Sequence, residues 1–85
     1  MSSIISDLRL KRRGQLDQLR KQRGAFEADA TDALTMILMK ADPLADISSL
    51  NSDAIRRAAE KLDDNVTAIK SIDRQIAAIN EELNG

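Results

Sequence analysis

The feature that most constrains this 85-residue chain is an apolar repeat in its second half. From residue 55 to residue 83 the repeat positions lie alternately three and four apart, a heptad pattern sustained for about four heptads. They are Ile55, Ala58, Leu62, Asn65, Ile69, Ile72, Ile76, Ile79 and Leu83, called here the seam. The opposite face carries charged residues such as Arg56, Asp63, Lys70 and Arg74. The pattern predicts a helix whose seam is buried against another helix.

The first half of the chain has a looser apolar stripe. Leu8, Leu19, Ala30 and Ala41 lie eleven residues apart, a spacing closer to a straight helix than to a left-handed supercoil. Arg12 and Arg23 interrupt this stripe where a coiled coil would place Leu. Gly14 and Gly24 each cost about 1 kcal/mol relative to Ala in a helix interior. We therefore expect a helix that is weak between residues 9 and 24 and depends on packing.

One strong break separates the two halves. Pro43 cannot donate a backbone hydrogen bond and restricts Asp42, so the first helix should end near residue 41. A Ser- and Asn-rich stretch follows, with a short helical turn expected between residues 43 and 50, and Ser52 with Asp53 is a good helix start. We predict an all-α antiparallel two-helix hairpin, coiled-coil-like, forming one domain over residues 1–85. Its helices span about 3–41 and 53–83, the turn spans 42–52, and two copies dimerise into a four-helix bundle.

Folding the chain about this turn predicts a register in which paired residue numbers sum to about 94. Phe26 then lies beside Ala68 and Ile69, a large residue opposite a small one. Arg12 and Arg13 come level with Glu81 and Glu82, and Arg20 comes level with Asp73. The register thus matches side-chain volume and charge between the two helices.

Two groups of apolar residues are left over by this pairing. Ile4, Ile5 and Leu8 project past the end of the second helix, and the turn region is apolar on more than one face. A single partner helix cannot cover both groups, and exposed apolar surface usually marks an interface. Met36 and Met39 lie away from the stripe of Leu34, Ile37 and Leu38, and fit either core gap-filling or a binding surface. The predicted interaction residues are Ile4, Ile5, Leu8, Leu34, Met36, Met39, Leu44 and Ile47.

The composition argues against catalysis. The chain has no His and no Cys, which removes the usual nucleophile–base pairs, disulfides and most transition-metal sites. Neighbouring acids such as Asp63 and Asp64 point in different directions on a helix, so they are expected to be solvated. We therefore expect no enzyme activity, catalytic residue, cofactor, metal or small-molecule substrate. No run of about 18–20 apolar residues predicts a membrane span. A cytoplasmic location is expected, with export that needs no cleaved signal as the alternative.

Basic residues concentrate at the start of the chain. Residues 1–24 have a net charge of +5 and residues 25–85 a net charge of −6, giving −1 overall. Such asymmetry can mark contact with nucleic acid or with an acidic membrane, and the candidates for nucleic-acid contact are Arg9, Lys11, Arg13 and Lys21. The competing interpretation is that the basic half of the first helix neutralises the acidic end of its antiparallel neighbour. With a single aromatic residue, Phe26, nucleic-acid binding is the less favoured function.

Asn65 is the one polar position in the seam. A lone buried Asn in a coiled coil often sets register and the number of partners at a cost in stability, and we favour that role over a wet interface. In length, two-helix layout and the turn Lys40-Ala41-Asp42-Pro43, the chain resembles type III secretion needle subunits, whose turn carries two prolines. The short hairpin also resembles the plasmid copy-number regulators that dimerise on RNA. Neither resemblance shares residue motifs, so neither assigns a site. The expected partners are a second copy of the chain or another helical protein.

Overall fold

All regular secondary structure in the part of the chain that the structure describes is helical. The structure is a computed structural model that describes residues 2–84, and the side chains of residues 4–84. Helix α1 spans Ser2–Lys40, the short 3₁₀ helix η1 spans Ile47–Ser49, and helix α2 spans Ser52–Asn84. No strand occurs among these residues. Each long helix begins and ends within one residue of the range expected from the sequence.

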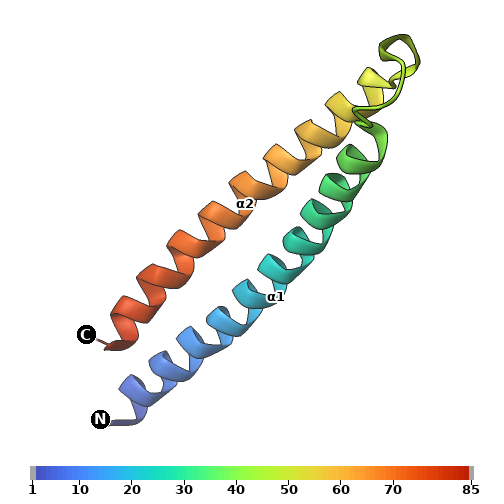
Figure 1. Cartoon of the computed structure of the whole chain (residues 1–85). Coiled ribbons are helices and arrows are strands. Elements are labelled where there is room, and N and C mark those ends of the chain that lie inside the picture. The colour runs from blue at the N-terminus through green and yellow to red at the C-terminus, as the bar shows by residue number, and fades with distance from the viewer. Residues whose placement is uncertain (1, 85) are drawn as a thin grey trace.

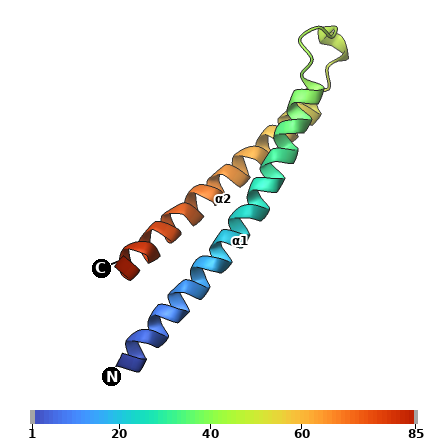
Figure 2. The same cartoon turned by 60° about the horizontal axis from the view of Figure 1, so that its bottom comes forward.

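The two long helices lie side by side in antiparallel directions and form a rod of 70 × 16 × 16 Å (Figure 1). The turn is at one end, and the start of α1 and the end of α2 are at the other, called here the open end (Figure 1). At 39 residues α1 is longer than α2, which has 33, and it reaches beyond α2 at the open end (Figure 2). Neither helix, as described, is both long and apolar enough to cross a membrane.

Short polar side chains organise the turn between the helices. The Asp42 carboxylate accepts a hydrogen bond from the backbone N–H of Leu44 at 2.9 Å. Asp46 is the N-cap of η1. The Asn51 side chain accepts a hydrogen bond from the backbone N–H of Ala54 at 3.0 Å, so Asn51 caps α2, whose first residue is Ser52. The expected helical turn over residues 43–50 is reduced to η1, because side chains meet the hydrogen-bonding needs of this segment locally.

The seam of α2 lies at the interface with α1. Ala58, Asn65 and Ile72 are buried and the other six seam residues are half-buried, whereas Arg56, Asp63, Lys70 and Arg74 are exposed. Helix α1 contributes two buried residues, Leu16 and Ala33. Among the described side chains none is fully buried. The two helices therefore pack as the heptad pattern predicts, but around a thin core.

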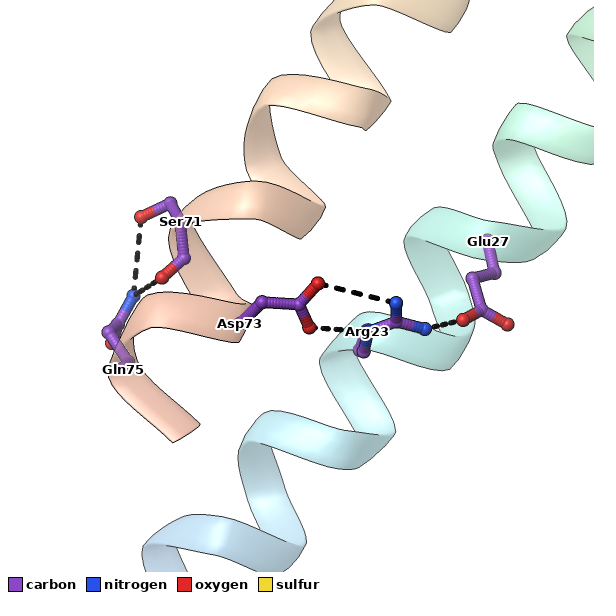
Figure 3. A network of polar contacts seen from close by, with 5 residues as sticks. All are labelled: Arg23, Glu27, Ser71, Asp73 and Gln75. Carbon is purple, nitrogen blue, oxygen red and sulfur yellow. Dashed lines mark hydrogen bonds and ion pairs between the residues drawn. The ribbon is translucent and has the colours of Figure 1, made fainter. Parts of the chain in front are cut away.

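Two arginines on the apolar stripe of α1 bridge the helices. Arg12 pairs with Glu82 at 2.8 Å, and this pair fits the predicted register. Arg23 pairs with Asp73 at 2.7 Å, which corrects the expected pairing of Asp73 with Arg20 (Figure 3). Arg20 lies near Asp17 of its own helix instead, at 4.0 Å. Arg12 and Arg23 are half-buried, so their stems cover the stripe while their charged ends reach acids at its rim.

Candidate interaction surfaces

The turn end of the rod carries most of the large exposed apolar side chains. All five residues predicted there are exposed, with Met39 at 76% and Leu44 at 93% of full exposure. Leu38 is also 71% exposed, although the sequence pattern grouped it with the packed stripe. It follows Ile37, and one residue turns a helix by about 100°, so Leu38 faces away from α2. We call Leu34, Met36, Leu38, Met39, Leu44 and Ile47 the turn-end cluster.

The open end carries a second apolar group. Ile4, Ile5 and Leu8, called here the open-end stripe, continue the face of α1 that packs on α2 farther along the helix. They are exposed because α2 ends near the level of Arg12, whose ion-pair partner is Glu82. Leu10 is exposed as well and was not predicted, because a single apolar residue between Arg9 and Lys11 belongs to no stripe. The open-end stripe and the turn-end cluster lie at opposite ends of the rod, so the predicted interaction residues do not form a single surface.

Two grooves run between the helices. One, near the turn, is lined by Met36 and small residues together with Asp32, Arg57 and Lys61. The other, near the open end, is lined in part by Leu19, Ala78 and Ile79. All four glutamines of the chain line this second groove, namely Gln15, Gln18, Gln22 and Gln75. Helical periodicity places both grooves on the same side of the hairpin, so this side has narrow hollows between its helices.

Asn65 occupies the middle of the interface and is only 6% exposed. Its side-chain amide donates a hydrogen bond to the backbone carbonyl of Lys61 in the same helix, at 2.9 Å. No described buried side-chain nitrogen or oxygen lacks a partner. The amide is thus satisfied within α2, without a hydrogen bond to α1 in this single hairpin.

The four candidate nucleic-acid residues, Arg9, Lys11, Arg13 and Lys21, are all exposed. Arg9 and Arg13 are four residues apart and therefore share one side of α1. Lys11 lies between them on roughly the opposite side, and Lys21 is turned by about 80° from Arg13. The helix brings together only the two arginines of this set.

The best-defined polar contact is centred on Arg23 (Figure 3). Its guanidinium donates to both carboxylate oxygens of Asp73, at 2.7 and 3.4 Å, and also pairs with Glu27 one turn along α1. These hydrogen bonds raise the pKa of Arg23 and lower the pKa of Asp73, and the charge attraction adds a smaller effect in the same direction for each. Both side chains remain accessible to water, so this ion pair links α1 and α2 at the surface of the hairpin.

Within the described residues, no group of three or more Asp or Glu side chains lies close enough together to hold a metal ion. Asp63, Asp64, Glu81 and Glu82 are all exposed on α2. The most developed chemical features of this chain are therefore its apolar surfaces and its charge distribution.

Comparison of the chain with protein-family models, with curated proteins and with solved structures finds no match in any of the three.

Proposed function

We propose that this chain is a self-associating helical hairpin that works as a structural or adaptor module through helix–helix packing, with a dimeric four-helix bundle as its working form. The observation that carries the proposal is the exposed apolar surface of the hairpin, above all the turn-end cluster. Surface of this kind usually marks an interface. We propose no catalytic role, since the chain has neither His nor Cys and its acids are exposed.

The accessible surface area of the hairpin is larger than expected for a monomer of its mass, which supports the presence of a partner. A compact monomer of 9.4 kDa would expose about 5000 Å² by the usual scaling of surface with mass. The hairpin exposes 6586 Å², an excess of roughly 1600 Å². Removing this excess from each of two copies would bury about 3200 Å² in total, which is within the range of obligate homodimers.

The thin core leads to the same expectation. Only Leu16, Ala33, Ala58 and Ile72 are buried apolar residues in the described part of the chain, and two of the four are alanines. Chains of this size rarely gain more than about 3–5 kcal/mol from a single core. Disulfides cannot supplement it because the chain has no Cys. Packing against a second hairpin would supply the missing burial.

A matched pair of variants tests the proposal. Leu34→Gln/Leu38→Gln changes two side chains that are 47% and 71% exposed in the single hairpin, and it leaves the four buried apolar residues of the core unchanged. Gln also has a helix propensity close to that of Leu. By light scattering after gel filtration at micromolar concentration, we expect the double variant to shift from dimer toward monomer. Ala28→Gln, at another exposed position of α1, is the control and should remain dimeric. A double variant that dimerises as tightly as the unmodified chain would contradict the proposed interface.

Binding to nucleic acid is the second candidate function, and one observation favours it. Arg9 and Arg13 lie exposed on one side of α1, whereas Arg12 and Arg23 are engaged with acids of α2. Phosphate contacts would give an affinity that falls steeply with salt. We expect Arg9→Gln/Arg13→Gln to weaken binding to a short duplex RNA or DNA and to flatten its salt dependence. Lys40→Gln, at the turn end, is the control. Undetectable binding of the unmodified chain at 50 mM salt would rule out this function.

A further inference from the structure

The charges of the hairpin separate along its long axis. The Arg23–Asp73 pair divides the rod into an open half, residues 2–24 and 72–84, and a turn half, residues 25–71. The open half holds eight basic and five acidic residues, a formal net charge of +3. The turn half holds five basic and nine acidic residues, a formal net charge of −4. Each copy is therefore an electrostatically polar rod 70 Å long.

From this arrangement we propose that two copies pack antiparallel, with the turn end of each hairpin beside the open end of the other. This inference rests on the proposed self-association and adds the orientation of the partner. Side by side in this way, each positive half lies along a negative half. A head-to-head arrangement, in which the two turn ends lie side by side, would instead place like-charged halves together. Like charges that face each other at an interface are unfavourable.

The apolar surfaces fit the antiparallel arrangement. The open-end stripe lies on α1 beyond the end of α2, so nothing within its own hairpin covers it. In an antiparallel pair, this stripe comes level with the turn half of the partner. There Leu34 and Leu38 are exposed one helical turn apart on the same side of α1, near the turn. The open-end stripe of each copy would thus pack beside Leu34 and Leu38 of the other.

The charges determine the orientation, because the apolar surfaces alone would also allow the two turn ends, or the two open ends, to pack against each other. Exposed charges farther apart than about 10 Å are largely screened at 0.1 M salt. Raising the salt should therefore weaken an antiparallel dimer, in which opposite charges attract. It should strengthen a head-to-head dimer, in which like charges repel. We expect the dissociation constant to rise several-fold between 50 and 500 mM NaCl.

Fluorescence transfer between single-cysteine variants tests the orientation directly, because the chain has no native Cys. Ser48→Cys places a dye in the turn and Ser6→Cys places one near the open end, both at exposed positions. Mixing donor-labelled Ser48→Cys with acceptor-labelled Ser6→Cys should give high transfer. Mixing donor- and acceptor-labelled Ser48→Cys should give low transfer, since the two turns would lie at opposite ends of a rod of 70 Å.

The reverse pattern, or equal transfer in both mixtures, would overturn the antiparallel orientation while leaving self-association in place. Sedimentation of the same labelled samples separates the two proposals. A monomeric mass for the labelled chains and for the unmodified chain would overturn self-association, and the orientation with it. A dimeric mass, with high transfer only between labelled Ser48→Cys and labelled Ser6→Cys, supports both proposals.

Discussion

At the scale of single residues, the ion pairs show how far sequence reasoning reaches. Summing paired residue numbers predicts that Arg12 comes level with Glu82, and the structure pairs them. The same reasoning matched Asp73 with Arg20, whereas Arg23 is the actual partner. The position of a residue along the helix axis does not determine which side of the helix it faces. Arg23 lies eleven residues after Arg12, which is close to three full turns of an α-helix, so both arginines share one side of α1.

The Arg23–Asp73 pair should make stability depend on pH. The pKa of Asp73 is lower in the folded chain than in the unfolded chain because Arg23 hydrogen-bonds its carboxylate. The stabilisation is therefore present above the pKa of an unfolded Asp, about 4, and is lost as the pH falls through the lower folded pKa. We expect Asp73→Asn to lower the melting temperature slightly at pH 7. The difference from the unmodified chain should disappear near pH 2, and a difference that persists there would contradict the assignment.

Asn65 offers a second test at this scale. Its amide is buried in the seam and is satisfied only by the carbonyl of Lys61 in its own helix. Replacing a buried Asn by Leu at such a position removes a desolvation cost. We expect Asn65→Leu to raise the free energy of unfolding by about 1–2 kcal/mol, measured by urea denaturation. A change in oligomer number would show that Asn65 selects the partner, and a less stable variant would contradict its placement in the seam.

At the scale of elements, periodicity predicts the helices well and the connection less well. The seam positions of α2 are all buried or half-buried because a repeat of three and four keeps them on one side of a helix. The turn depends on local side-chain hydrogen bonds in a stretch rich in Ser and Asn. Ser52 with Asp53 was the expected start signal of α2, and α2 begins at Ser52, but Asn51 makes the capping bond. Choosing among neighbouring caps requires the backbone path, which periodicity does not supply.

The two glycines of α1 provide the test at this scale. A Cβ atom added at Gly14 or Gly24 would meet nothing within 4 Å apart from its immediate surroundings in the helix. Ala at each position should therefore stabilise the helix by about 1 kcal/mol without a steric cost. We expect Gly14→Ala/Gly24→Ala to raise the free energy of unfolding by about 2 kcal/mol if the two effects add. A destabilised double variant would show that a partner or a bend requires these glycines.

At the scale of the whole molecule, the candidate surfaces were only partly predictable. Eight interaction residues could be named from the sequence because most of them were left over by the helix pairing, and the structure exposes all eight. Leu38 and Leu10 were missed. Leu38 sits next to a packed residue, and its exposure depends on where the stripe of α1 faces α2 near the turn. The separation of charge between the two halves also needs the hairpin, because it combines segments distant in sequence.

Self-association is the central claim, and sedimentation equilibrium of the unmodified chain tests it most directly. Because the single hairpin has a thin core and a large exposed surface, its mass at micromolar concentration should be that of two chains. The average mass should fall toward that of one chain of 9.4 kDa only on strong dilution. A folded, helical monomer at all micromolar concentrations would contradict the claim.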